Sequence, residues 1–148
     1  MKTLSIAILA ATAMLFATGT TLEAAPPASE GVVHRVMSQP LPSQPGTDVT
    51  VITVDYPPGG STPPHEHPGY TYAYVLQGAV VSQLDAQKPV TYKTGEMWTE
   101  KPHEHHMVSK NASATEPARL LVFMIAPHGM PLTTMLPVKP SPEASARS

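Results

Sequence analysis

The chain has 148 residues, no cysteine and a formal net charge of −2 at pH 7. This charge gives no basic surface for nucleic acid, and without cysteine the fold must be stabilised by packing or by a bound metal. Eighteen prolines and nine glycines interrupt the chain throughout, which disfavours long helices and favours short strands joined by turns.

The N-terminal residues have the order typical of a secretory signal. Lys2 is followed by an apolar, uncharged stretch over residues 4–17 and then by small residues up to Ala24. The apolar stretch is too short to cross a bilayer. We therefore expect residues 1–24 to be a signal peptide that is removed after Ala24. The mature protein is then expected to be exported, periplasmic or secreted, and to have no membrane anchor.

The rest of the chain reads as a succession of strands. Residues 48–56 alternate most clearly, and the continuous apolar run over residues 119–126 predicts a central strand buried on both faces. We expect an N-terminal segment at 25–46, a barrel at 47–136 and a disordered tail at 137–148. The expected strands span residues 32–37, 48–56, 70–76, 79–84, 90–93, 96–100, 105–110 and 119–126. This spacing predicts an all-β sandwich or barrel.

The tripeptide His-Glu-His occurs twice, and its first copy predicts a metal-binding pair. Three nearby prolines exclude a helix, so the segment is extended, and His65 and His67 point to the same side about 6–7 Å apart. Two imidazoles so placed can bind one metal ion, whereas Glu66 points away. The helical His-Glu-x-x-His zinc motif is excluded, because Gly69 stands where its second histidine belongs.

The second copy leaves two candidates open. In a strand, His103 and His105 share one face and His106 takes the other. If the face of His106 is the inner one, Lys110 is buried with it unless the strand bulges. Alternation alone does not choose between His105 and His106.

Two motifs in the chain resemble those of the cupin superfamily. The first motif is carried by Gly59, His65, His67 and Gly78, and the second by Gly95, Pro102, His106 and Asn111. The resemblance covers residues 45–127 and implies a short-stranded antiparallel jelly-roll barrel. It also implies that His106 is the third metal ligand, with His105 a weaker candidate and His103 in the place of a turn glycine.

The chain departs from the cupin pattern at Thr71, where the family has a glutamate ligand. Because threonine is neutral, an ion bound by three imidazoles would keep its full charge. Such a site suits Fe, Mn, Ni, Cu or Zn, and some cupin dioxygenases use three histidines. On the next strand, Gln83 is a weaker candidate ligand through its carbonyl oxygen.

Other residues near the motifs have less specific interpretations. The tyrosines at 70, 72 and 74 are expected to face outward, in packing or in a dimer contact. Either Met97 or Trp98 should line the barrel. Glu96, Glu100 and Glu104 are interpreted as surface charge, with a general-base role for one of them as the alternative.

The resemblance does not specify an activity, and the expected three-histidine site leaves two kinds of function open. The first is a metal-dependent dioxygenase-type enzyme acting on a small anionic or enolisable molecule, such as a catechol, a flavonol or a β-diketone. The alternative is a non-catalytic cupin of the cell envelope that binds or senses a metal or small ligand. A homodimer is the expected assembly.

Overall fold

A computed structural model describes residues 29–137 of the chain. In this part every regular element is a strand, and no helix is present that could span a membrane. The expected signal peptide lies outside the described residues, as does almost all of the expected tail. Strands and turns therefore account for the whole architecture described below.

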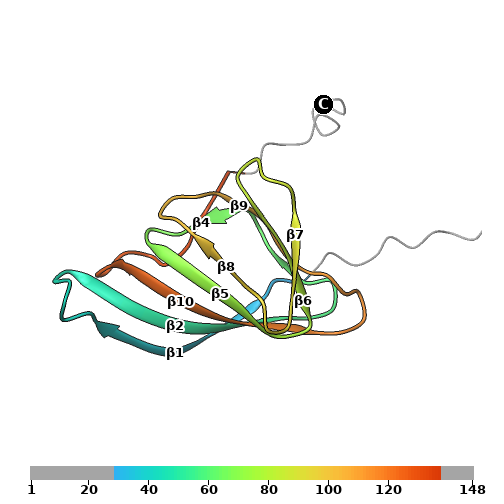
Figure 1. The fold of residues 1–148 in the computed structure, drawn as a ribbon, viewed down its shortest axis with the longest axis horizontal. Coiled ribbons are helices and arrows are strands. Elements are labelled where there is room, and N and C mark those ends of the chain that lie inside the picture. Colours follow the sequence, from blue (N-terminus) through green and yellow to red (C-terminus); the bar gives the residue numbers. More distant parts are fainter. Residues whose placement is uncertain (1–28, 138–148) are drawn as a thin grey trace, which may run out of the picture.

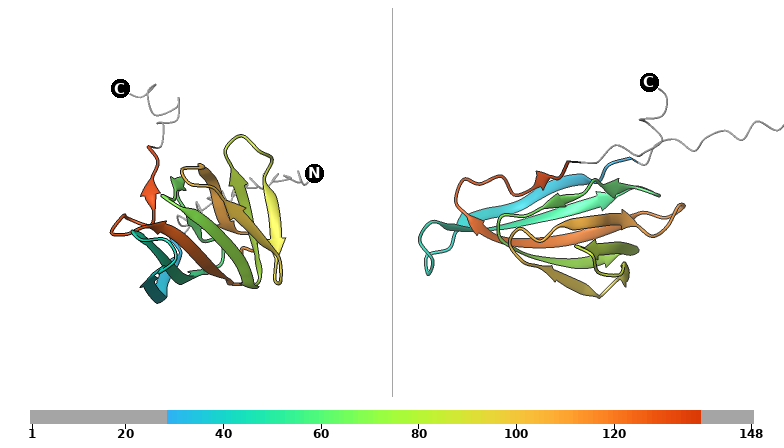
Figure 2. Two further views of the ribbon diagram at one scale, coloured as in Figure 1. Left: turned by 60° about the vertical axis from the view of Figure 1, so that its left-hand side comes forward. Right: turned by 90° about the horizontal axis from the view of Figure 1, so that it is seen from above.

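Two antiparallel sheets pack face to face, as Figures 1 and 2 show. The first sheet has the order β1 (Val32–Pro40), β2 (Thr47–Tyr56), β10 (Ala118–Pro127), β5 (Tyr70–Gln77) and β8 (Met97–Glu100). The second has the order β11 (Thr134–Met135), β4 (His65–Glu66), β9 (His106–Asn111), β6 (Ala79–Leu84) and β7 (Val90–Lys93), with β3 (Ser61–Thr62) also paired to β9. The predicted all-β antiparallel jelly-roll fold is confirmed.

The strands follow the predicted positions closely, with one correction. Strands β6 and β7 have the predicted bounds, and β1 continues to Pro40 beyond the expected end at residue 37. The prediction that residues 119–126 are buried on both faces is wrong. Along β10 burial alternates, from Leu120 at 3% exposed to Phe123 at 42%. The second sheet covers only the inner face, so the outer apolar residues of β10 face solvent.

The core lies between the sheets. It consists of Ile52, Val54, Tyr56, Ala73, Val75, Val80, Trp98, Ala118, Leu120, Val122 and Met124. Trp98 is an inner residue of β8 and Met97 is 51% exposed on the other face, so Trp98 is the one that lines the interior. The three tyrosines of β5 are exposed on the outer face, as predicted. Burial of aliphatic side chains such as Val75 and Val80 contributes about 1.5–3 kcal/mol each.

Candidate metal centre

The first histidine pair lies on and just after β4, with both imidazoles turned into the space between the sheets. His65 and His67 are buried, whereas Glu66 is half-buried on the opposite side. His65 is also the residue of β4 that pairs with His106 of β9. The predicted alternation of this segment therefore holds, and strand pairing brings in a third histidine.

Backbone carbonyls fix the tautomers of the first pair. Nδ1–H of His65 donates to the Pro63 carbonyl at 2.8 Å, and Nδ1–H of His67 donates to the Leu132 carbonyl at 2.7 Å. Because a carbonyl only accepts, Nε2 of each ring keeps its lone pair free. Burial lowers the pKa of His65 to about 4, so this imidazole is neutral at pH 7. Both rings are therefore oriented as metal ligands usually are.

His106, the first residue of β9, completes a group of three. Its ring is buried, and its centroid lies 4.9 Å from that of His65. Nε2 of His106 shares a hydrogen bond of 2.9 Å with Ser82 Oγ, and Nδ1 has no hydrogen-bond partner among the described residues. One ring nitrogen from each of His65, His67 and His106 lies within 4.8 Å of the others. This group could hold a metal ion.

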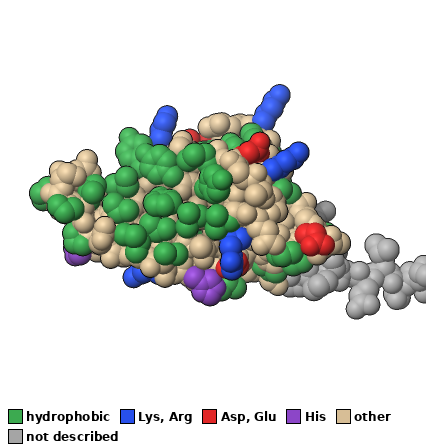
Figure 3. Space-filling view, turned by 60° about the horizontal axis from the view of Figure 1, so that its bottom comes forward, with side chains coloured by type: hydrophobic (Ala, Val, Ile, Leu, Met, Phe, Trp, Pro, Cys, Tyr) green, Lys and Arg blue, Asp and Glu red, His purple; other side chains and the backbone are tan. Residues whose placement is uncertain are grey.

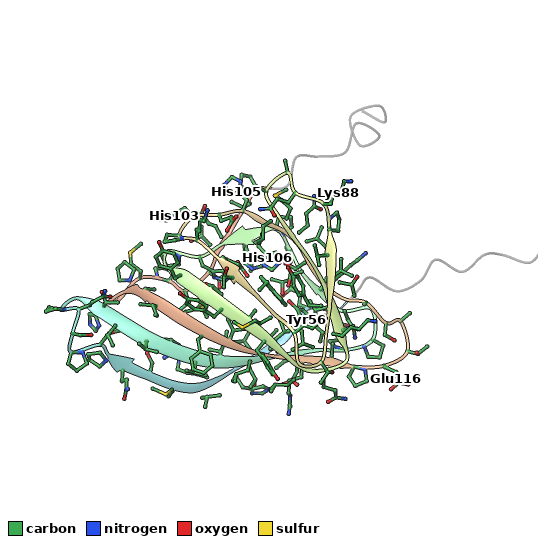
Figure 4. All side chains as sticks on the ribbon, in the orientation of Figure 1. Tyr56, Lys88, His103, His105, His106 and Glu116 are labelled. Carbon is green, nitrogen blue, oxygen red and sulfur yellow. The ribbon has the colours of Figure 1, made fainter. Side chains whose placement is uncertain are left out.

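The other two histidines of the second copy lie outside the centre. Figure 4 shows His103 and His105 on the outer loop, away from His106 inside the molecule. His103 has a positive φ of 60° and so occupies the turn position that the resemblance gave it. Its Nδ1 contacts Glu66 at 3.0 Å, and the His105 side chain is 51% exposed between Glu66 and Asp85. Of the two alternatives, the structure brings His106 into the group and leaves His105 out.

The prediction that Gln83 reaches the site is wrong. Its side-chain amide donates to the Gln87 carbonyl at 2.9 Å, outside the cavity. The neighbouring Ser82 faces inward instead and bonds to His106. A shift of one residue moves every side chain of a strand to the opposite face, and the sequence contained no marker of which face of residues 79–84 is inner.

The interpretation of Glu100 as surface charge is also wrong. Glu100 is 2% exposed and stands beside the histidines. Its Oε1 accepts a hydrogen bond of 2.9 Å from Trp98 Nε1–H and lies 3.3 Å from His106 Nδ1, and its Oε2 lies 3.6 Å from His67 Nε2. Burial alone would raise the pKa of Glu100, but these contacts hold it below its usual value. Residues two apart in a strand share one face, so Glu100 lies on the same face as Trp98. An inward Trp98 was therefore the signal that Glu100 is buried.

The histidines and Glu100 line one side of a cavity of about 200 Å³ that is partly open to solvent. The apolar part of the wall comes from the first sheet, which also carries Glu100, and includes Ile52, Val54, Ala73, Leu120, Val122 and Met124. A second polar group lies on the wall where Tyr56 Oη meets Ser109 Oγ at 2.9 Å and Thr62 Oγ1 at 2.7 Å. The cavity thus combines one nitrogen- and oxygen-rich side with an apolar wall, as small-molecule sites commonly do.

Orphaned polar atoms indicate that this donor set fits a metal ion. Among the buried side-chain atoms without a hydrogen-bond partner in residues 29–137 are Thr71 Oγ1, Glu100 Oε2 and His106 Nδ1. All three residues line the cavity. Buried polar atoms are nearly always paired, so unpaired ones at one place indicate a missing partner. Imidazole nitrogens with a carboxylate oxygen are the donors that Zn²⁺, Fe²⁺ and related ions take.

Comparisons with known proteins agree with this fold. A model of the cupin domain matches residues 52–124. A protein with a double-stranded β-helix domain from Klebsiella pneumoniae superposes with a TM-score of 0.58 at 18% identity, over 76% of this chain and 90% of that one. A protein from Thermus thermophilus gives a TM-score of 0.52 at 24% identity, over 66% of this chain and 84% of its own.

An oxalate oxidase solved with the substrate analogue glycolate also superposes, with a TM-score of 0.52 at 21% identity. It is matched over 66% of this chain and only 55% of its own length. No curated protein matches the chain. At these identities the structural likeness concerns the fold alone.

Proposed function

The chain belongs to the cupin superfamily, and we propose that it binds one divalent transition metal ion through His65, His67 and His106. The observation that carries this proposal is the convergence of three buried imidazoles on one side of a cavity, each with a free ring nitrogen. Carbonyl groups orient two of the rings and Ser82 contacts the third. This is the outer support that metal-binding histidines need.

We further propose a metal-dependent dioxygenase-type activity on a small anionic or enolisable molecule. A divalent transition metal at this site would supply Lewis acidity toward substrate oxygens and redox capacity toward O₂. The residues that line the cavity bind and orient the substrate. The apolar wall around Val122 and Met124 holds the carbon skeleton and excludes water, and the histidine side receives its oxygens. The hydroxyl of Tyr56 adds a polar contact at the cavity wall.

The cavity volume limits the size of the expected substrates. A cavity of about 150 Å³ is enough to hold benzene, so one of about 200 Å³ holds a single ring or a molecule of similar size. Catechols and β-diketones fit this volume, whereas a three-ring flavonol would extend into solvent. Oxalate is added only as a further compound to test, because the likeness to an oxalate oxidase concerns the fold.

The test combines metal analysis with oxygen uptake. The purified protein is reconstituted with Fe²⁺, Mn²⁺, Ni²⁺, Cu²⁺ or Zn²⁺, and the bound metal is counted. Oxygen uptake is then measured with a catechol, a β-diketone, a flavonol and oxalate. We expect one ion per chain and uptake with a catechol or a β-diketone. The His65→Ala, His67→Ala double variant should bind no stoichiometric metal, and a variant that binds as much as the parent would show that the site is wrongly assigned.

The alternative is a non-catalytic cupin that binds or senses a metal or small ligand. It is favoured if stoichiometric metal is bound and ligands shift the spectrum of the bound ion, but no compound is turned over. The same reconstituted samples distinguish the two functions.

We also propose that the protein is exported. The charged start, the apolar stretch over residues 4–17 and the small residues before Ala25 support this. Mass spectrometry of the protein recovered from the cell envelope or medium should give Ala25 as the first residue. Recovery in the cytosol with residues 1–24 retained would contradict export.

A homodimer is proposed as the assembly. The outer face of the first sheet exposes Met37, Tyr70, Tyr72, Tyr74, Met97 and Phe123. Figure 3 looks onto this side of the molecule and shows the hydrophobic side chains gathered there. A contiguous apolar patch on a soluble domain usually marks an interaction site. We call these six residues the outer apolar face.

A further inference from the structure

Glu100 is a buried carboxylate, and in the part of the chain that the structure describes no lysine or arginine lies beside it in the cavity. It is 2% exposed, and the residues that line the cavity include neither lysine nor arginine. Burying a charge is costly unless an opposite charge or several hydrogen bonds compensate for it. Within residues 29–137, one hydrogen bond, from Trp98 Nε1–H to Oε1, holds this carboxylate, and Oε2 has no hydrogen-bond partner.

The free side of this carboxylate faces the histidine group. Oε2 lies 3.6 Å from His67 Nε2, and Oε1 lies 3.3 Å from His106 Nδ1. Two donors bound at about 2.1 Å from one ion are separated by about 3.0–3.4 Å when they are adjacent ligands. The 3.6 Å between Oε2 and His67 Nε2 is slightly longer than the separation of neighbouring ligands, and the 3.3 Å to His106 belongs to Oε1, the oxygen that Trp98 also holds. Among the described residues, only the three histidines have ligand atoms that all lie within 4.8 Å of one another, and Glu100 lies beside this group.

Strand pairing explains why a carboxylate is found here. Thr71 of β5 is the direct partner of Glu100 on β8, and both side chains line the cavity. The β-carbons of such partners lie about 5 Å apart, so side chains at the two positions can reach the same volume. The short Thr71 side chain leaves room for Glu100, and its hydroxyl has no hydrogen-bond partner within residues 29–137.

We infer that Glu100 is the fourth protein ligand of the metal ion, and that β8 supplies the carboxylate that the cupin pattern places at position 71 on β5. This inference rests on the proposed metal site at the three histidines. As a ligand, the Glu100 carboxylate adds a negative charge to a set that otherwise consists of neutral imidazoles. Trp98 holds Oε1 and leaves Oε2 to bind the ion.

The test measures Co²⁺ binding, because Co²⁺ reports its ligands through visible absorption. Glu100→Gln should lower the Co²⁺ affinity about 100-fold, measured by chelator competition, and should change the absorption of the bound ion. The Thr71→Glu, Glu100→Gln double variant returns a carboxylate from the neighbouring strand. It should recover at least about tenfold of the lost affinity. Glu116→Gln, at an exposed glutamate far from the centre in Figure 4, should match the parent in both measurements.

Two results would overturn the inference while leaving the three-histidine site intact. One is a Glu100→Gln variant that binds Co²⁺ with the affinity and spectrum of the parent. The other is a loss of affinity with an unchanged spectrum and no recovery in the double variant, because Glu100 would then only position His106. If Glu100→Gln fails to fold, Glu100→Asp replaces it. Aspartate keeps the charge but withdraws the carboxylate by one methylene, so a loss of affinity and a spectral change are again expected. A parent protein that binds none of the divalent ions overturns the proposed function and this inference together.

Discussion

Thr71 and Glu100 lie opposite each other across β5 and β8, and both side chains are buried in the wall of one cavity. The cupin pattern places its carboxylate ligand at the position of Thr71, so this chain lacks it on β5. The register of the two strands instead sets a carboxylate beside it; Trp98 holds one of its oxygens, and the other has no hydrogen-bond partner in the described part of the chain. The site is thus a three-histidine group with an adjacent buried negative charge.

The contrast between His105 and His106 gives the first prediction. His106→Ala should abolish stoichiometric metal binding, because His106 is buried in the group of three. His105→Ala should bind metal like the parent, because its side chain is 51% exposed and faces Glu66 and Asp85. Metal content per chain after equilibration with Zn²⁺ measures both. Equal losses in the two variants would contradict the assignment.

The second prediction concerns the pH dependence of stability in the metal-free protein. Burial lowers the pKa of His65 to about 4, whereas an unfolded chain titrates histidine near 6.5. Between these values the unfolded state binds more protons than the folded state, so the free energy of unfolding falls as the pH falls. Above pH 6.5 the titration of His65 does not reduce the free energy of unfolding. By pH 4 it has reduced this free energy by about 3 kcal/mol.

Urea unfolding at pH 7, 6, 5 and 4 measures this loss. His65→Asn removes the titrating group and should flatten the curve over this window. The lowered pKa of Glu100 acts in the same direction below a pH of about 4.5, where the carboxylate of the unfolded chain takes up a proton before that of the folded state does. A His65→Asn variant with the slope of the parent would show that another group is responsible.

The third prediction concerns the support that Trp98 gives to Glu100. Trp98→Phe removes the Nε1–H that donates to Glu100 Oε1 but keeps an aromatic ring near Tyr92, whose centroid lies 4.9 Å away. We expect a loss of about 1 kcal/mol in the free energy of unfolding and about a tenfold loss of metal affinity. Chelator competition measures the affinity. Tyr92→Phe, which leaves the Trp98–Glu100 bond intact, should retain the parent affinity.

The sequence was sufficient for the fold because its strands carry strong local signals. Alternation with β-branched residues placed β2 and β6 within a residue of their ends, and it correctly turned the tyrosines of β5 outward. The prediction failed for residues 119–126, where a continuous apolar run was interpreted as a strand buried on both faces. Hydrophobicity alone does not distinguish a second buried face from an exposed apolar surface.

The site was predictable where it depends on neighbours in sequence, and less so where it depends on strand pairing. His65 and His67 follow from alternation in an extended segment. Glu100, Ser82 and the exclusion of Gln83 depend on which residues face one another across β5, β8, β6 and β9. Register across strands far apart in the chain is set by the whole sheet, so no local pattern contains it.

The fourth prediction concerns the outer apolar face. Tyr72 and Phe123 are direct partners on β5 and β10, and both are exposed. If two copies meet there, Tyr72→Lys and Phe123→Lys place charges in an apolar contact and should give monomers. Val90→Lys changes a residue that is 47% exposed on the other sheet and should leave the dimer intact. Light scattering coupled to size exclusion measures the mass, and a monomeric parent would contradict a dimer through this face.

The fifth prediction concerns Gly69, where the chain passes from the histidine pair into β5. A β-carbon at this position would overlap the Ile125 carbonyl oxygen and would lie 2.6 Å from the α-carbon of Ala126. Both are backbone atoms of β10, so no side-chain rotation relieves the contact. Gly69→Ala should therefore cost about 3 kcal/mol in the free energy of unfolding. It should also weaken metal binding, because His67 is two residues away.

Gly59→Ala is the matched control for this change. A β-carbon at Gly59 meets nothing within 4 Å, and only the positive φ of 70° penalises it. A non-glycine residue in that conformation costs about 1 kcal/mol. Urea unfolding of the two variants separates steric contact from backbone conformation. If Gly69→Ala is no less stable than Gly59→Ala, then β5 and β10 approach each other less closely at Gly69 than this structure has them.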